Sequence, residues 1–303
     1  MITIFGSINL DLIGRLTRIP KPGETVPGSS FASAPGGKGA NQALAARRAG
    51  AEVRLVGAVG SDHFAIEALQ LLKSAAVDLG KVSAQEGATG IAMIFVDDKG
   101  ENVIGILPGA NATPSAADAD AAVAAMRARD VLVVQQEVPQ AATRRALEAA
   151  RARGITSIIN TAPFLADTAE IAGLASIVVA NETEFALLTG VHPTEKRMEE
   201  YVRATGQTLI VTLGADGARV AAPGGVSHHV AAPRITPVDT VAAGDTFVGY
   251  LAEGLQAGYG ADAVLSAMRR AVVAASLACL KPGAQPSIPY SSEVEAALNS
   301  GSM

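Results

Sequence analysis

The segment of this sequence best suited to chemistry is Asp239–Phe247, which reads DTVAAGDTF. Its small residues Ala242, Ala243 and Gly244 form a turn that leads into an apolar stretch, Phe247–Leu255, with the pattern of a helix. Small residues let the backbone turn tightly and leave its N–H groups open, and a helix N-terminus adds partial positive charge. Together these features predict a site for a phosphate-like anion.

An acid, Asp245, stands where this turn meets the helix. A carboxylate repels phosphate, so its position is explained if it accepts a proton from a hydroxyl group that attacks the phosphorus. The alternative is that Asp245 only caps its helix, which is the commoner use of such a residue. The motif alone favours capping, and the other motifs of the chain favour the catalytic interpretation.

A second glycine-rich motif, Pro35–Gln42 (PGGKGANQ), brings Gly37, Lys38 and Asn41 to the start of a predicted helix. Three glycines in four positions allow the backbone to approach a ligand closely. The motif is not a Walker A loop, because a glycine follows Lys38 where Ser or Thr is required. A turn followed by a helix cap is the alternative interpretation.

Polar residues also follow several predicted strands, where ligands bind in a doubly wound sheet. Asn9 and Asp11 lie two apart at the end of the first strand, so they share a face and suit sugar hydroxyls, although local turn capping fits equally well. Asn181 and Glu184 suit a magnesium ion held through water, although acids also favour a helix start. Glu137 follows a further strand.

The segment Thr212–Gly217 (TLGADG) follows another strand, and its glycines Gly214 and Gly217 allow the backbone to approach a nucleotide. A pair of glycines at this spacing is a weak signal by itself. The chain has neither a Gly-x-Ser-x-Gly elbow nor a complete dinucleotide fingerprint, which argues against a hydrolase of that class and against an oxidoreductase.

Composition excludes other classes of protein. The 303 residues carry a formal net charge of -5, so no overall basic field attracts nucleic acid. The one cysteine, Cys279, cannot form an internal disulfide and is expected to be a buried thiol. The N-terminus lacks the pattern of a signal peptide, and the longest apolar run, Ala271–Leu280, is too short to span a bilayer. We therefore expect a cytoplasmic protein that binds neither nucleic acid nor membrane.

Short β-branched runs alternate with alanine-rich runs of helical character, which predicts an α/β fold with a mostly parallel sheet covered by helices on both faces. The expected strands are Val53–Gly57, Val131–Gln135, Ile155–Ile159, Ile177–Ala180 and Leu209–Leu213. The expected helices are Asn41–Ala49, Ile66–Ala75, Ser115–Ala128, Gln140–Arg153 and Glu182–Leu188.

Two regions interrupt this alternation. Residues 12–35 contain four prolines and no helical period, and residues 89–107 show two apolar strands around a turn near Asp98–Gly100. We expect these regions to form a small β-rich flap over the ligand edge of the main sheet. Such an apolar flap must cover either the core domain or a second subunit. An ordinary edge hairpin is the alternative.

Taken together, these motifs resemble those of the ribokinase-like carbohydrate kinases, the PfkB superfamily. The blocks GSINLDL, PGGKGANQA, NETE, TLGADG, DTVAAGDTF and KPGAQPS occur in the family's order and cover essentially the whole chain. DTVAAGDTF is highly specific for the superfamily, while GGKGANQA and GAQPS together point to its ribokinase branch. The resemblance implies one domain over residues 1–303, a Rossmann-like three-layer sandwich with a β-sheet lid formed by about 12–35 and 89–107.

The resemblance also implies roles for individual residues. Asp245 matches the catalytic base, and the N–H groups of Ala242, Ala243 and Gly244 match an anion hole for the transferred phosphoryl group. The residues implied to bind the sugar are Asn9, Asp11, Gly37, Lys38, Asn41, Glu137 and Asp245. Those implied to bind the nucleotide are Asn181, Thr212, Gly214, Gly217, Ala243, Gly244 and Val272. Val272 is apolar where the family often has a polar residue near adenine.

Two metal sites are implied in the same way. Asn181 and Glu184 match the motif that holds Mg²⁺ through water. The residues that resemble a K⁺ site are Asp239 and Ser287 with the carbonyl groups of Val241, Ala278, Lys281 and Gly283.

The activity implied by the resemblance is ATP-dependent phosphorylation of the primary hydroxyl of a pentose, first of all D-ribose to ribose 5-phosphate. Deoxyribose, fructose, adenosine and pseudouridine remain alternative substrates, and a non-catalytic sugar-binding relative is the alternative from another class. ATP, Mg²⁺ and K⁺ are the expected cofactors, and the family implies a homodimer formed through the lid.

Overall fold

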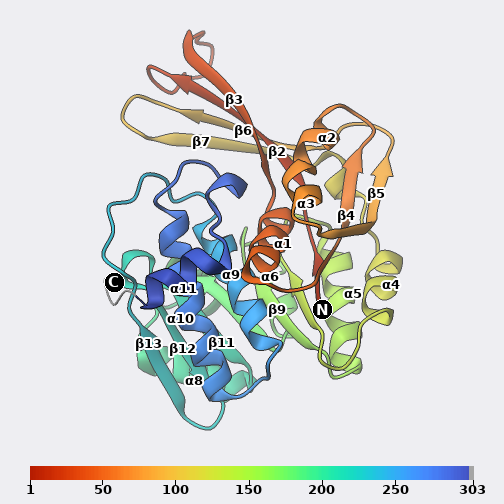
Figure 1. Ribbon diagram of the computed structural model, residues 1–303, viewed down its shortest axis with the longest axis vertical. Helices are drawn as coiled ribbons and strands as arrows, with labels where there is room; N and C mark the ends of the chain where they lie inside the picture. Colours follow the sequence, from red (N-terminus) through yellow and green to blue (C-terminus); the bar gives the residue numbers. More distant parts are fainter. Residues whose placement is uncertain (300–303) are drawn as a thin grey trace.

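The computed structural model describes residues 1–299, which contain two β-sheets of unequal size (Figure 1). Neighbouring strands of the large sheet are parallel except at one edge, where the last two run antiparallel. Its strands lie in the order β13 (Val226–Val230), β12 (Ala218–Ala222), β11 (Thr208–Thr212), β10 (Ile177–Asn181), β9 (Thr156–Asn160), β8 (Val131–Val134), β1 (Ile2–Phe5), β4 (Val53–Gly60) and β5 (Asp78–Gln85). The expected mostly parallel α/β sheet is confirmed.

Alternate side chains of these strands enter two separate hydrophobic cores, as the period of two in a β-strand requires. In β8, Val131 and Val133 belong to one core, while Leu132 and Val134 belong to the other. The first core is covered by α1 (Lys38–Ala49), α2 (Phe64–Ala68), α3 (Gln70–Ser74), α9 (Ala243–Leu255), α10 (Ala261–Ala278) and α11 (Ser291–Asn299). The second is covered by α4 (Ala116–Ala124), α5 (Gln140–Ala152), α6 (Thr168–Ala172), α7 (Glu182–Thr189) and α8 (Glu195–Thr205). Helices thus cover both faces of the large sheet, as the apolar strands at its centre predict.

The small sheet has the order β3 (Gly28–Gly36), β2 (Asn9–Leu16), β6 (Gly90–Val96) and β7 (Asn102–Leu107). It projects from one end of the main body, at the top of Figure 1. Its strands fall in the two regions that interrupt the α/β alternation, so the small sheet expected there is confirmed. Several large apolar side chains of this sheet are exposed, namely Phe31, Met93, Val103, Ile104, Ile106 and Leu107.

The chain passes from the large sheet to the small one between β1 and β2. We expected Asn9 and Asp11 at the end of the first strand, and this is wrong, because both lie in β2. The interruption has a local cause. The N–H of Ile8 donates to the side chain of Asn111, and the carbonyl of Ile8 accepts from the same side chain. The backbone of Ile8 therefore pairs with no strand of either sheet.

Some helix boundaries also differ from expectation. Helix α9 begins at Ala243 rather than Phe247, because the turn at Ala242 already directs its carbonyl to the N–H of Thr246. The helix expected over 66–75 is divided at Leu69, whose ψ of -4° is far from that of a regular helix. Helix α4 ends at Ala124, because the side chain of Asp130 accepts the N–H of Arg127 and turns the chain toward β8.

Helices α1 and α9 pack closely against each other, next to the first turns of both. Gly249 of α9 makes this approach possible, because a Cβ added there would lie 2.7 Å from the backbone nitrogen of Ala46 in α1. None of the helices within residues 1–299 combines the length and apolar character needed to cross a membrane.

Candidate active site

The predicted functional residues gather at one edge of the large sheet. Strands β4 and β5 lie on one side of β1, and strands β8 to β11 lie on the other, so the order of connection changes at β1. In open α/β sheets, ligands bind outside the carboxyl ends of the strands at such a point. Strands β1, β8, β9, β10 and β11 run parallel to one another, so the segments that follow them reach the same edge of the sheet. The first turns of α1 and α9 meet at this edge, where Gln42 contacts both Asn160 and Asp245.

Asp245 lies in the first turn of α9 and is buried, with 7% of its surface exposed. The side-chain amide of Asn41 donates to one carboxylate oxygen, and that of Gln42 donates to the other, both at 2.9 Å. The N-cap residue is Ala242, and no side chain caps the helix. The interpretation of Asp245 as a helix cap is therefore wrong, and its carboxylate faces the first turn of α1 instead.

The turn before Asp245 has a backbone geometry that suits the predicted anion site. Ala242 has a φ of 60°, which costs a residue with a Cβ about 1–2 kcal/mol. The N–H of Ala243 donates to the carbonyl of Thr240 at 3.3 Å. Gly244 and Asp245 stand in the first turn, where a helix offers no carbonyl one turn earlier. Their N–H groups are therefore the ones best placed to bind an anion.

Several acidic side chains, Asp245 among them, act on one buried lysine, Lys38. Burial, reinforced by the charges of Glu137 and Asp245, raises the pKa of Asp11 to about 7, although Lys38 opposes the shift. Burial alone would lower the pKa of Lys38, but the carboxylates, Asp245 first and then Glu137, Glu184 and Asp11, raise it overall. The predicted sugar-binding residues therefore share one electrostatic environment, in which Lys38 remains charged.

Glu137 connects this acidic cluster to the small sheet of β3, β2, β6 and β7, which we call the lid. One of its oxygens accepts from the hydroxyl of Ser7 at 2.5 Å and from the backbone N–H of Lys38 at 3.1 Å. Glu137 also lines a cavity of about 330 Å³, together with Ile106 of β7 and Asn111. The base of the lid and the acidic cluster thus border the same cavity.

The glycines of the second motif permit close contact with β2. Gly37 has a φ of 88°, and a Cβ there would lie 2.6 Å from the backbone nitrogen of Asn9. A Cβ on Gly36 would lie 2.5 Å from the carboxyl carbon of Asp11. These contacts bring the start of α1 and the polar residues of β2 together.

Sequence reasoning missed two residues of this site. Gln42 binds Asp245, donates to Asn160 at 3.1 Å, and accepts from Gln135 at 2.6 Å. Asn111 donates to the side-chain oxygen of Asn9 at 2.7 Å. Gln42 adjoins Asn41 in the glycine-rich motif, which was a usable signal. Asn111, in η1 (Gly109–Ala112), stands in no motif that we identified.

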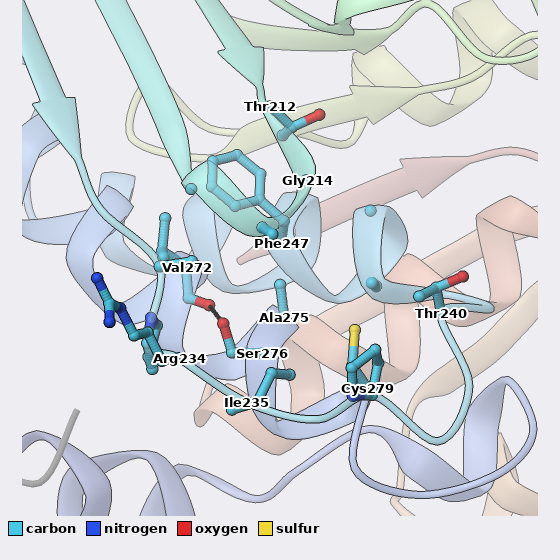
Figure 2. A pocket seen from close by; sticks show the side chains of 17 residues that line it. Thr212, Gly214, Arg234, Ile235, Thr240, Phe247, Val272, Ala275, Ser276 and Cys279 are labelled. Atoms are coloured by element: carbon cyan, nitrogen blue, oxygen red, sulfur yellow. Dashed lines mark hydrogen bonds between the residues drawn. The ribbon is translucent and has the colours of Figure 1, made fainter.

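A cavity of about 550 Å³ lies beside the first turn of α9 (Figure 2). Six of the residues predicted to bind a nucleotide line it, namely Thr212, Gly214, Gly217, Ala243, Gly244 and Val272. Asn181 is not among the described residues that line it. Cys279 also lines this cavity and is only half-buried, so the prediction that its thiol is buried is wrong. Partial burial raises the pKa of this thiol.

Asn181 and Glu184 form a reciprocal cap at the start of α7. The side chain of Asn181 accepts from the N–H of Glu184, and the carboxylate of Glu184 accepts from both nitrogens of Asn181. Thr161 donates to the same carboxylate at 2.9 Å. The pair therefore does what acids at a helix start commonly do, which was the alternative interpretation.

The residues predicted for K⁺ bring two loops together. The carboxylate of Asp239 accepts from the N–H of Val241 at 3.0 Å and from that of Gly283 at 2.9 Å. The hydroxyl of Ser287 donates to the carbonyl of Ala284 at 2.8 Å. Within residues 1–299, no group of three or more His, Cys, Asp or Glu side chains is placed to hold a metal ion. A cation here would depend on backbone carbonyl groups.

Known proteins are similar to this chain over nearly its whole length. A ribokinase of Staphylococcus aureus is 37% identical over 97% of this chain and 98% of its own length. A deoxyribokinase of Salmonella typhi is 34% identical over 95% of both chains. The structure of an Arabidopsis thaliana ribokinase complexed with ribose and ATP superposes with a TM-score of 0.85 at 27% identity, covering 98% of each chain. The family profile "pfkB family carbohydrate kinase" matches residues 1–290, and the chain therefore belongs to the pfkB family of carbohydrate kinases.

Proposed function

We propose that this chain transfers the γ-phosphoryl group of ATP to the primary hydroxyl of D-ribose, forming ribose 5-phosphate. The observation that carries the proposal is the position of Asp245. Its carboxylate is bound by Asn41 and Gln42, while the residue before it, Gly244, lines the 550 Å³ cavity. The similarity to ribokinases over nearly the whole chain supports the choice of ribose.

In this proposal the sugar binds between the lid and the first turn of α1. The hydroxyl groups of the sugar find carboxylate acceptors in Asp11 and Glu137 and a charged donor in Lys38. The side-chain amides of Asn9 and Asn41 offer further polar contacts. The primary hydroxyl then lies next to Asp245, which accepts its proton as the oxygen attacks the γ-phosphorus. Such a base contributes about 10²–10⁴-fold to the rate.

The nucleotide occupies the 550 Å³ cavity in this proposal, with its terminal phosphate at Gly244. N–H groups at the start of α9 stabilise the negative charge that develops on the phosphoryl oxygens, a contribution of roughly 3–4 kcal/mol for one such donor. Glu184 and Asn181 use their polar atoms on each other and on Thr161, so they suit Mg²⁺ bound through water rather than directly. Bound Mg²⁺ would neutralise charge on the phosphate oxygens.

The function is tested by measuring ADP release with ribose, 2-deoxyribose, fructose, adenosine and pseudouridine. Ribose should give the highest kcat/KM. In Asp245→Asn, kcat should fall by about 10²–10⁴-fold, because the amide cannot accept the proton. Ribose should still bind to this variant in calorimetry, because the replacement keeps the size of the side chain.

The results separate the alternatives. The 34% identity to a deoxyribokinase makes 2-deoxyribose the second candidate substrate, and higher kcat/KM with it would replace ribose in the proposal. Unchanged turnover in Asp245→Asn would exclude Asp245 as the base. Sugar binding without ADP release in the unaltered protein would indicate a non-catalytic relative.

Asp11 should make sugar binding depend on pH. Its pKa is raised from 3.8 to about 7, so the neutral form is favoured in the folded protein. This group contributes stability below about pH 4 and loses that contribution as the pH rises toward 7. At pH 8, the free energy of unfolding of Asp11→Asn should therefore exceed that of the unaltered protein by about 1–4 kcal/mol, and its unfolding temperature should be higher. The variant should nevertheless bind ribose more weakly.

The measurements are thermal unfolding and ribose calorimetry between pH 5 and 8. In the unaltered protein, kcat/KM for ribose should fall below about pH 7, as Asp11 is protonated and loses acceptor oxygens. Asp98→Asn, on the exposed turn of the lid hairpin, removes the same charge and should change neither property. A stability difference between Asp11→Asn and the unaltered protein that does not grow from pH 5 to 8 would contradict the assignment.

We also propose that the loops joined by Asp239 bind K⁺ beside the anion site. The donors fit a monovalent cation, because one carboxylate, carbonyl groups and a hydroxyl supply hard oxygen ligands with a low total charge. Asp239 retains acceptor capacity, since each of its oxygens accepts one backbone N–H. A cation here would fix the loop that leads through Ala242 into α9.

Replacing tetramethylammonium with K⁺ at constant ionic strength should raise both kcat and the unfolding temperature. At ten times its Kd, K⁺ should add about 1.4 kcal/mol to the free energy of unfolding. Asp239→Ala should abolish the K⁺-dependent part of both. If neither property of the unaltered protein responds to K⁺, the site does not bind the cation.

The exposed apolar side chains of the lid support a homodimer, because a small sheet with such a surface needs a partner to cover it. Sedimentation velocity should show a dimer of the unaltered protein. Val103→Asp, at a site 50% exposed on β7, should shift it to monomer by placing a charge in the interface. Leu187→Asp, 59% exposed on α7, is the matched control and should remain dimeric. A monomer at all concentrations for the unaltered protein would exclude the lid dimer.

A further inference from the structure

The two ends of the 550 Å³ cavity differ in chemistry (Figure 2). Thr240 lies on one side, and its carbonyl accepts from Ala243 at the start of α9. Arg234 and Val272 lie on the other side of the view. A nucleotide whose terminal phosphate meets the start of α9 therefore directs its base toward Arg234 and Val272.

Most of the cavity wall is apolar and suits the flat faces of a base. The apolar lining side chains are Ala215, Ala232, Pro233, Ile235, Pro237, Ala243, Phe247, Val272 and Ala275. The hydroxyl of Ser276 donates to the carbonyl of Val272 at 2.9 Å, so its proton is already engaged. Among the described residues that line the cavity, Arg234 carries the only formal charge.

Arg234 is exposed in the segment between β13 and α9, and it forms no hydrogen bond or ion pair within residues 1–299. A guanidinium group donates hydrogen bonds and accepts none. Guanine presents two adjacent acceptors, O6 and N7, whereas adenine presents N7 beside an amino group that itself donates. The guanidinium of Arg234 therefore matches the guanine edge with two hydrogen bonds and the adenine edge with one.

We propose that Arg234 contacts the purine edge of the phosphoryl donor, so that this chain uses GTP as well as ATP. The inference rests on the proposed kinase function and extends it to the class of donor nucleotide. Val272 does not oppose it, because its aliphatic side chain forms no hydrogen bond to the adenine amino group. The donor site accordingly recognises a purine by the apolar faces of its rings and by the hydrogen-bond acceptors on its edge.

The test compares kcat/KM for ATP, GTP and ITP at saturating ribose. ITP shares O6 and N7 with GTP, so both should lie within about tenfold of ATP, the scale of one hydrogen bond to a charged group. GTP and ITP efficiencies more than tenfold below that of ATP would overturn the inference. Absence of turnover with every donor would instead contradict the proposed function.

Arg234→Gln sharpens the test, because a glutamine side chain matches the N7 and amino groups of adenine. The GTP-to-ATP ratio of kcat/KM should fall by about 5–100-fold in this variant. Arg269→Gln, exposed on α10 outside the cavity, removes the same charge and should leave the ratio unchanged. Calorimetry with GDP and ADP, in which no turnover occurs, should show the same fall in the affinity for GDP relative to that for ADP. An unchanged ratio in Arg234→Gln would overturn the role of this residue.

Discussion

The carboxylate of Asp245 is bound by two amides from the first turn of α1, and the rest of the site depends on this contact. It joins the helix that presents Lys38 and Asn41 to the helix whose N-terminus borders the larger cavity. The two helices approach closely because Gly249 has no Cβ to meet the backbone of α1. The proposed base, the proposed sugar-binding side chains and the predicted anion site are therefore held together by direct contacts, which suits phosphoryl transfer because it depends mainly on positioning.

The same arrangement is electrostatically costly. Four carboxylates act on a single lysine, and the raised pKa of Asp11 shows that one of them is ionised only at the expense of folding stability. Functional sites commonly retain such costs, because groups that bind a ligand stay under-satisfied until the ligand arrives. A sugar with several hydroxyl donors would supply the missing hydrogen bonds to Asp11 and Glu137.

The site also lies between two parts of the molecule that differ in how much of their surface is buried. The large sheet and its helices contain two extensive cores, whereas every residue of β7 is exposed. Ile106 of that strand nevertheless borders the cavity shared with Glu137. A sheet with little core of its own can move relative to the main body, which suits a lid that excludes water during phosphoryl transfer.

The sequence by itself determined the fold class and identified most of the candidate residues that the structure brings together. Alternating strand and helix patterns predicted the parallel sheet, and DTVAAGDTF predicted both the anion turn and its acid. What only the tertiary structure decided is which side chains meet. Gln42 and Asn41 contact Asp245 across more than 200 residues of chain. The side chain of Asn111 takes the hydrogen bonds that a neighbouring strand would form with Ile8. Strand β1 therefore ends before Ile8, and Asn9 and Asp11 belong to β2. Such contacts depend on how helices and strands pack in three dimensions, and local periodicity contains no information about that packing.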